Sequence, residues 1–198
     1  MPAALIPKEE VLDRLTRVFR EVGYEGATLS RLAQATGLVK ASLYHYFPGG
    51  KGDMAGAVLA RANAWLEERA LAPLAGPGTP EERLRAMSRT LDEFYAGGRD
   101  GCLLGLLSQG DARDLFQTHV RAALQRWASA IATVLEEAGL DPDLARDRGE
   151  DAVIQIQGAL VVARGLGTTA PFSRTLSDLP ARLLAPAPPS PHPTRRLQ

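Results

Sequence analysis

Near the start of the chain, apolar residues recur every three or four positions, the spacing that places them on one face of an α-helix. These positions are Val11, Leu12, Leu15, Val18, Phe19 and Val22. Gly23 follows them, and glycine is frequent just past a helix end because it adopts left-handed backbone conformations without a steric penalty. We therefore predict an amphipathic helix over residues 8–22.

Two shorter helices are predicted after it. Thr28 is a favourable N-cap residue, and the apolar positions that follow it end at Gly37. A third helix is predicted over residues 40–46, and the Pro-Gly-Gly sequence at 48–50 ends it, since proline lacks a backbone N–H and glycine disfavours helices. Two short helices joined by a glycine-containing turn are typical of a helix-turn-helix.

The rest of the chain has the pattern of longer helices. One begins at Lys51 and is expected to reach about Leu71, and another begins after Thr79, which forms a capping-box motif with Glu82. Later helices are predicted before Gly139, from Asp141 onward, and over residues 171–184. Because no strand pattern of useful length and no internal repeat occurs, the predicted fold class is all-α.

The segment AVIQIQGALVVARG, residues 152–165, differs from the other predicted helices because it is apolar around almost its whole circumference. A helix on the surface of a protein shows an apolar stripe, whereas a helix that is apolar on all sides must be covered on all sides. A single chain of this length would hardly supply that cover. We therefore expect part of it to come from a second subunit.

The charge of the chain is balanced overall but uneven along the sequence. Lysine and arginine together number 23, as do aspartate and glutamate. Between residues 14 and 51 the basic residues outnumber the acidic ones; they are Arg14, Arg17, Arg20, Arg31, Lys40 and Lys51, against Glu21 and Glu25. A nucleic acid would respond to this local excess of positive charge.

Composition also limits the compartment and the chemistry. The one cysteine, Cys102, cannot form an intrachain disulfide, and no paired Cys/His spacing of a zinc site occurs. Neither a signal-peptide pattern nor an apolar run of membrane-spanning length is found. We expect a cytoplasmic protein without a metal, a cofactor or a membrane contact.

The third predicted helix has an inner and an outer face. Leu43 and Phe47 are four residues apart and are expected to pack inward with Leu32 and Leu38. The outward positions are then Lys40, Ala41, Ser42, Tyr44 and His45. These side chains offer a cation, hydroxyl groups and an imidazole to phosphates and base edges, and a small methyl that suits a thymine. Helix pairs of this kind also occur in proteins that never bind DNA, and Tyr46 can equally be a packed aromatic residue.

The sequence TLSRLAQATGLVKASLYHYFPGGK, residues 28–51, preceded by one helix and followed by a long one, closely resembles the DNA-binding domain of TetR-family transcriptional regulators. The similarity covers residues 8–60, and GCLLG at 101–105 and the PGGK turn are similar to the LmrA/YxaF-type branch. The resemblance implies an all-helical homodimer that binds a double-stranded operator and a small-molecule effector. It implies a helix-turn-helix domain over residues 1–50 and a ligand-binding and dimerisation bundle over 51–185. A proline-rich tail over 186–198 is expected to be disordered.

Site residues follow from the resemblance position by position. The positions expected at the operator are Thr28, Lys40, Ala41, Ser42, Tyr44, His45 and Lys51, with Tyr44 and Lys51 at phosphates. One departure is Leu29, where many family members carry a basic residue or a hydroxyl, so Thr28 is a weaker candidate for a cluster of phosphate contacts. The helices near residues 150–166 and 171–184 are expected to pair with their counterparts in a second subunit.

The effector site is less defined by the sequence. The candidate residues are Phe94, Tyr95, Cys102, Phe116, Trp127 and Gln155, together with Gln157 and His119. Each aromatic residue can instead be part of the core, and a lone cysteine often behaves as a small buried apolar residue. A buried glutamine needs a hydrogen-bond partner, which a ligand could supply.

Three hypotheses for function remain. The first is a ligand-responsive regulator, most simply a repressor that a small apolar molecule releases from a pseudo-palindromic operator. The second keeps the DNA-binding domain but makes Cys102 a redox sensor. The third, a remote one, is an enzyme with Cys102 as nucleophile, which would need a histidine base from His45, His119 or His192.

Overall fold

The computed structural model describes residues 6–186, and all regular secondary structure in that range is helical. The all-α prediction is therefore confirmed. The tail predicted over residues 186–198 lies, apart from residue 186, outside the described residues. Between residues 6 and 186, no helix combines the length and the apolar character needed to cross a membrane.

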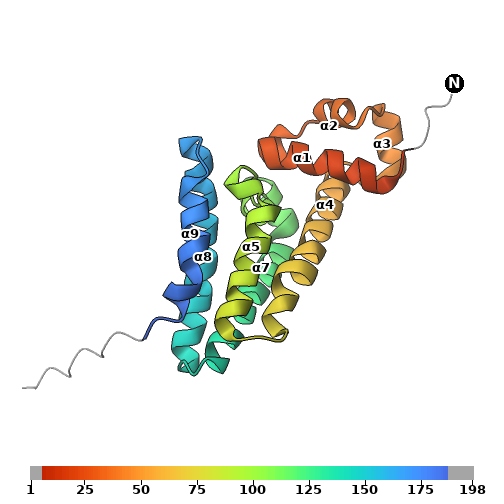
Figure 1. The fold of residues 1–198 in the computed structure, drawn as a ribbon. Coiled ribbons are helices and arrows are strands. Elements are labelled where there is room, and N and C mark those ends of the chain that lie inside the picture. The colour runs from red at the N-terminus through yellow and green to blue at the C-terminus, as the bar shows by residue number, and fades with distance from the viewer. Residues whose placement is uncertain (1–5, 187–198) are drawn as a thin grey trace, which may run out of the picture.

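Three helices form a small unit at one end of the molecule (Figure 1). They are α1 (Lys8–Gly26), α2 (Leu29–Thr36) and α3 (Lys40–Tyr46). The break expected at Gly23 is present as a kink, because its φ of 69° and ψ of −172° are not helical, but helical hydrogen bonding resumes for one more short turn. Thr28 caps α2 as predicted, since its side-chain oxygen accepts a hydrogen bond from the Arg31 backbone N–H at 3.3 Å.

The predicted inner face of α3 is buried. Leu43 and Phe47 lie in one apolar cluster with Leu32 and Leu38. Gly37 ends α2 in the left-handed conformation, with a φ of 72°, which turns the chain toward α3. The two short helices therefore form a packed helix-turn-helix on top of α1.

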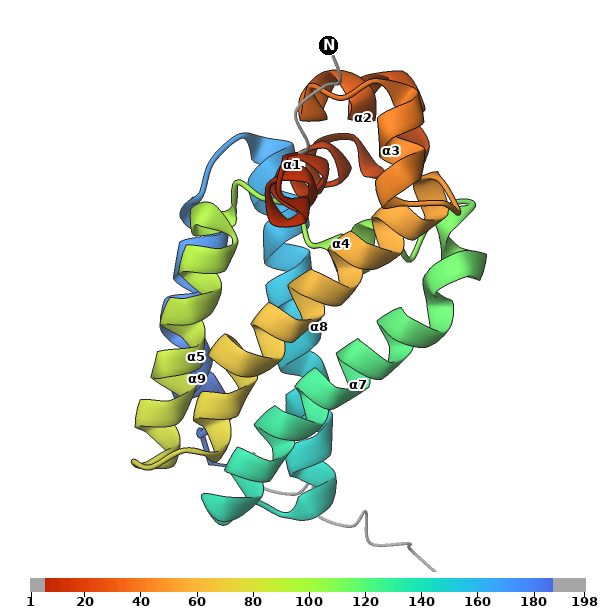
Figure 2. The ribbon, with the colours of Figure 1, turned by 90° about the vertical axis from the view of Figure 1, so that its right-hand side faces the viewer.

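The remaining helices form a bundle that continues from this unit (Figures 1 and 2). They are α4 (Lys51–Trp65), α5 (Pro80–Phe94), α6 (Leu103–Leu106), α7 (Ala112–Glu137), α8 (Pro142–Leu166) and α9 (Ala170–Leu183). Helices α8 and α9 lie side by side, at the side of the bundle away from α4. The buried apolar side chains of the helix-turn-helix unit and the bundle belong to one continuous cluster.

The long helix expected from Lys51 to about Leu71 is not regular over its whole length. The α-helix ends at Trp65, a π-helical turn covers Leu66–Leu71, and a short 3-10 turn covers Ala72–Ala75. Pro73 in that last turn has no backbone N–H to continue an α-helical pattern. The following helix begins as predicted, because Thr79 and Glu82 form both hydrogen bonds of a capping box.

The turn between α3 and α4 depends on its two glycines. The Gly49 backbone N–H donates to Asp53 Oδ2 at 2.6 Å. Gly50 has a φ of 73°, a conformation that favours glycine. A Cβ atom on Gly50 would lie 3.3 Å from Cε1 of Tyr44, so the absence of a side chain lets the tyrosine ring rest against the backbone.

We predict that Gly50→Ala lowers the free energy of unfolding by about 1 kcal/mol or more, because alanine is strained at this φ and crowds Tyr44. Gly52→Ala is the matched control. Its Cβ would meet only the Tyr24 hydroxyl at 4.0 Å, and alanine favours the helix there. Urea unfolding of both variants measures the difference, and a Gly50→Ala protein as stable as Gly52→Ala would contradict the account.

Candidate nucleic-acid interface

The outward side of α3 carries the side chains that the sequence assigned to it. Lys40, Ala41, Tyr44 and His45 are exposed, and Ser42 is half-buried. Neither α2 nor α3 contains an aspartate or a glutamate. The helix therefore offers hydrogen-bond donors and positive charge to a polyanion, without a carboxylate to repel it.

Tyr44 has a defined position on this surface. Its ring lies against the backbone of Gly50, and the residue is 44% exposed. A tyrosine fixed in this way can direct its hydroxyl at one phosphate with little loss of side-chain entropy on binding.

Tyr46, by contrast, has a structural role. Its hydroxyl donates a 2.6 Å hydrogen bond to the backbone carbonyl of Ile6, and the side chain is half-buried. The ring of His45 meets the Tyr46 ring edge-on, with centroids 6.1 Å apart. Tyr46 therefore supports the exposed histidine next to it.

Lys51 is turned toward α1 in this structure. Its ammonium donates to the backbone carbonyl of Tyr24 at 3.1 Å and lies 4.0 Å from the centroid of the Tyr24 ring. Burial raises the pKa of Tyr24 above its usual value, and the nearby charges of Glu25 and Asp111 add to this effect. Lys51 thus joins the start of α4 to the end of α1.

The local excess of basic residues in the sequence is not a continuous cationic surface. Arg14 donates to the Thr36 carbonyl at 2.7 Å, which fastens α1 to the end of α2. Arg20 forms an ion pair with Asp100 at 2.7 Å, in the chain segment that precedes α6. With Lys51, at least three of the six basic side chains therefore have structural partners rather than facing outward with α3.

Two exposed residues beside α3 are not among the operator contacts that the sequence predicted, although Arg31 was counted in the local excess of positive charge. Val39, directly before the helix, is 65% exposed, and Arg31 on α2 is exposed with one nitrogen 3.4 Å from the Gly26 carbonyl. An apolar residue at the start of a recognition helix can contact a thymine methyl, and an arginine can reach a phosphate. The sequence did contain one indication that Val39 is exposed. Val39 is not one of the positions, such as Leu38 and Leu43, that the helical pattern directs toward the core.

Three of the effector candidates meet at one place in the bundle. Phe94, Tyr95 and Cys102 line a cavity of about 10 Å³, together with Arg20 of α1. This volume holds about one water molecule. The Phe94 ring stacks on Trp65 at a centroid distance of 4.2 Å, so a larger ligand could enter only if these rings moved.

Cys102 receives two hydrogen bonds at its sulfur. The Tyr95 hydroxyl and the Gln157 amide nitrogen each donate to Sγ at 3.3 Å. Burial, followed by the neighbouring Cys102, raises the pKa of Tyr95 well above its usual value, so the phenol keeps its proton and remains a donor. Neither hydrogen-bond donor to the sulfur is a histidine, which leaves Cys102 without the base that an enzymatic nucleophile needs.

The other candidates lie elsewhere. Phe116 packs edge-on against Tyr24 with centroids 6.1 Å apart, and Trp127 is fully buried. Gln155 is half-buried, and its Oε1 atom has no hydrogen-bond partner among the described residues. His119 is exposed on α7. None of these four residues lines the cavity beside Cys102.

Two family descriptions match this chain. "Bacterial regulatory proteins, tetR family" matches residues 11–58, which contain the helix-turn-helix. "Transcriptional regulator LmrA/YxaF-like, C-terminal domain" matches residues 80–177, which contain most of the bundle. Together the two ranges cover most of the sequence.

Individual proteins agree with these matches. The transcriptional regulator LmrA of Bacillus subtilis is 23% identical over 177 residues, covering 87% of this chain and 94% of its own length. A TetR transcriptional regulator from Legionella pneumophila has the same fold, with a TM-score of 0.78 at 18% identity, covering 91% of this chain and 98% of that one. The regulator FadR of Bacillus subtilis, solved in complex with stearoyl-CoA, has a TM-score of 0.70 at 17% identity, covering 90% and 98%.

The packed helix-turn-helix, the acid-free outer side of α3 and the two family matches support one conclusion. The family that both descriptions name consists of transcriptional regulators and not of enzymes. The chain belongs to this TetR family of DNA-binding transcriptional regulators, and its C-terminal domain is of the LmrA/YxaF-like type.

Proposed function

We propose that the protein binds a pseudo-palindromic operator as a homodimer and represses transcription until a small, apolar molecule binds to the bundle. The observation that carries this proposal is the outer side of α3, where exposed Lys40, Tyr44 and His45 stand on a helix whose other side is buried. We also propose that residues 1–50 form the DNA-binding domain and residues 51–185 the regulatory one. A dimeric helix-turn-helix protein places its two recognition helices in successive major grooves.

The proposed contacts divide into two kinds. Lys40, Ser42 and His45 would meet base edges, and the methyl of Ala41 would meet a thymine. Thr28, Tyr44 and Lys51 would hold phosphates. The fixed ring of Tyr44 supports its role, whereas Lys51 would have to exchange its bond with the Tyr24 carbonyl for a phosphate.

The outer side of α8 supports the proposed dimer. Ile154 is 65% exposed and Val161 is 72% exposed, and both lie on a helix whose opposite side is buried in the bundle. A Cβ atom on Gly158, between them, would have no neighbour within 4 Å. Contiguous exposed apolar side chains of this kind mark an interaction surface. A second copy of α8 with its neighbour α9 would cover it.

The effector proposal rests on the cavity beside Cys102. Phe94, Tyr95 and Cys102 would contact the effector directly, and Phe116, Trp127 and Gln155 would join them if the bundle opened further. The ligand of FadR, a long-chain acyl compound by its name, supports an apolar effector for this fold. A ligand releases the operator only by binding more tightly to the conformation that does not fit DNA.

A second candidate mode of regulation is oxidation of Cys102. The observation that favours it is the pair of hydrogen bonds that the sulfur accepts from Tyr95 and Gln157. In such a reaction the Cys102 sulfur attacks one peroxide oxygen and the O–O bond breaks, which gives a sulfenic acid and a hydroxide ion that takes up the thiol proton to form water. Arg20 of α1 also lines this cavity, so a change in the size or charge of the Cys102 side chain would alter the packing of α1.

For operator binding, we predict that Lys40→Ala weakens binding to the specific duplex by roughly 5- to 150-fold, since one good base contact contributes about 1–3 kcal/mol. The loss on unrelated duplex should be smaller. Tyr44→Phe should weaken binding to both duplexes by a similar factor, because a phosphate contact carries no sequence information. Fluorescence anisotropy with duplex from the region upstream of the gene, at several salt concentrations, measures both affinities.

The control for these variants is Arg121→Ala, which removes one exposed positive charge from α7. It should leave the affinity for both duplexes nearly unchanged. If Arg121→Ala weakened binding as much as Lys40→Ala, binding would depend on total charge and the role of α3 would be wrong.

For dimerisation, we predict that Val161→Glu converts the protein to a monomer, because it places a charge in the centre of the apolar surface of α8. Leu115→Glu is the control. Leu115 is also an exposed large apolar residue, but it lies on α7. Sedimentation velocity should show a monomer only for Val161→Glu, and a dimer for both variants would contradict the proposed interface.

For redox control, we predict that hydrogen peroxide weakens operator binding by wild type at least several-fold if Cys102 is the sensor, and that Cys102→Ser abolishes the response. Serine keeps nearly the same size and still accepts hydrogen bonds from Tyr95 and Gln157. Equal operator affinity of wild type before and after peroxide, with the sulfenic acid verified by mass spectrometry, would exclude this mode.

A further inference from the structure

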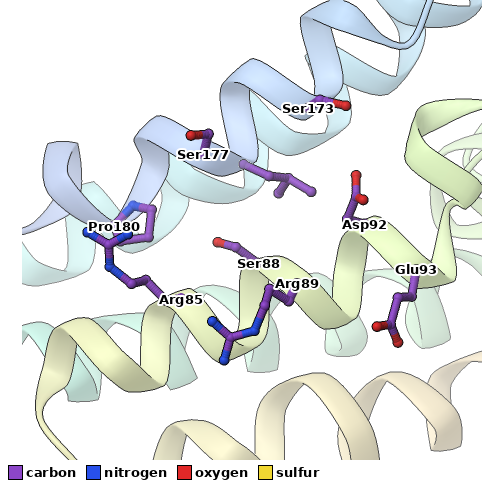
Figure 3. A pocket seen from close by; sticks show the side chains of 9 residues that line it. Arg85, Ser88, Arg89, Asp92, Glu93, Ser173, Ser177 and Pro180 are labelled. Carbon is purple, nitrogen blue, oxygen red and sulfur yellow. The ribbon is translucent and has the colours of Figure 1, made fainter.

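A second and larger cavity lies between α5 and α9 (Figure 3). It has a volume of about 360 Å³. The residues that matter for its chemistry are Ser88 and Asp92 on α5, and Ser173, Leu176, Ser177 and Pro180 on α9. It shares no lining residue with the cavity beside Cys102.

Two buried oxygen atoms in this cavity lack partners. Ser88 is only 6% exposed, and neither its Oγ atom nor Oδ1 of Asp92 has a hydrogen-bond partner among the described residues. The two residues are one helical turn apart, and both side chains lie on the side of α5 that faces α9 (Figure 3). Buried polar atoms are nearly always hydrogen-bonded in folded proteins, so these two atoms mark a place where a polar ligand group could bind; the carboxylate accepts, and the hydroxyl can accept or donate.

The other charges around the cavity leave the Asp92 carboxylate unpaired. Arg85 already forms an ion pair with Glu81 at 2.6 Å. Arg89 and Glu93 lie on the same helix as Asp92, but their charged groups point away from α9 (Figure 3). Within residues 6–186, Asp92 has no ion-pair partner within 4.0 Å. A ligand with a positive charge would complete this site.

The wall opposite Asp92 suits an ammonium group. Ser173 and Ser177 are one turn apart on α9, and both line the cavity. A primary ammonium carries three N–H donors, and a carboxylate with two serine hydroxyls would supply three acceptors. Leu176 and Pro180 add apolar surface against which an alkyl chain could lie.

We propose that the cavity between α5 and α9 binds a small aliphatic amine through its ammonium group. The Asp92 carboxylate and Ser88 Oγ accept hydrogen bonds from the ammonium, and a serine of α9 completes the set. Leu176 and Pro180 contact the alkyl chain. The charge of Asp92 excludes a carboxylate ligand of the same length, and a neutral alcohol gains no ion pair.

Occupancy of this site would join α5 to α9. Because α9 belongs to the proposed dimer surface, a bound amine would also influence how two subunits pair. This regulatory consequence rests on the proposed function, whereas the binding of an amine does not. The binding site can therefore be tested without DNA.

The experiment uses hexylamine as the probe, with hexanol and hexanoate as neutral and anionic molecules of the same chain length. Calorimetric titration of the full chain should show saturable binding of hexylamine, and no saturable binding of hexanol or hexanoate. Asp92→Asn should weaken hexylamine binding at least about tenfold, because it removes the charge and keeps the shape. Glu93→Gln, the matched control on the same helix, should bind hexylamine like wild type.

Two further variants keep the proposal testable if the Asp92→Asn protein does not fold. Ser173→Ala and Ser177→Ala change exposed residues on the opposite wall, where loss of folding is not expected, and at least one should weaken binding several-fold. Equal binding of hexylamine and hexanol, or undiminished binding by Asp92→Asn, would overturn the proposal. Failure here would leave operator binding intact, and failure of operator binding would leave this titration unaffected.

Discussion

The burial of Leu43 and Phe47 against Leu32 and Leu38 decides which side of α3 can meet DNA. A seven-residue helix has little stability of its own, so this packing is what holds it in place. Once the apolar side is fixed inward, helical geometry directs Lys40, Ala41, Tyr44 and His45 outward. The proposed recognition surface is thus a consequence of the core beneath it.

A small number of side-chain contacts, both polar and aromatic, connect the DNA-binding helices to the bundle. Arg20 of α1 pairs with Asp100, and its guanidinium lies 4.5 Å from the centroid of the Phe94 ring. Phe94 in turn stacks on Trp65, where α4 changes to a π-helical turn. Arg164, at the end of α8, reaches the Arg20 backbone carbonyl at 3.5 Å. A molecule that displaces Phe94 therefore disturbs the contact that positions α1, which gives the effector proposal a physical route to the DNA-binding helices.

The sequence predicted those parts of the structure that depend on neighbouring residues. Helix limits such as Thr28, Gly37 and the capping box of Thr79 follow from local hydrogen bonding, so spacing alone identified them. It did not predict the partners of long side chains. Arg20 finds its carboxylate 80 positions away in the sequence, and Lys51 turns to a carbonyl of α1.

The sequence did not predict the two cavities either, because each is lined by residues that are far apart in the chain. Ser88 and Asp92 look like ordinary polar residues of α5 in the sequence, and only the packing of α9 beside them buries Ser88 Oγ and Asp92 Oδ1. Cys102 was a candidate site residue because it is the one cysteine of the chain. The two groups that donate hydrogen bonds to its sulfur belong to Tyr95 and Gln157, which only the fold brings together. Tertiary packing, rather than residue type, determines which polar groups meet in a cavity.

The central claim, that the outer side of α3 binds DNA, is tested most directly by hydroxyl-radical labelling of side chains with and without the operator duplex. Tyr44 and His45 are exposed in the free protein and should lose reactivity when duplex is bound. His119, exposed on α7, provides the internal reference and should keep its reactivity. Unchanged labelling of Tyr44 and His45 in a sample shown by anisotropy to be fully bound would contradict the account.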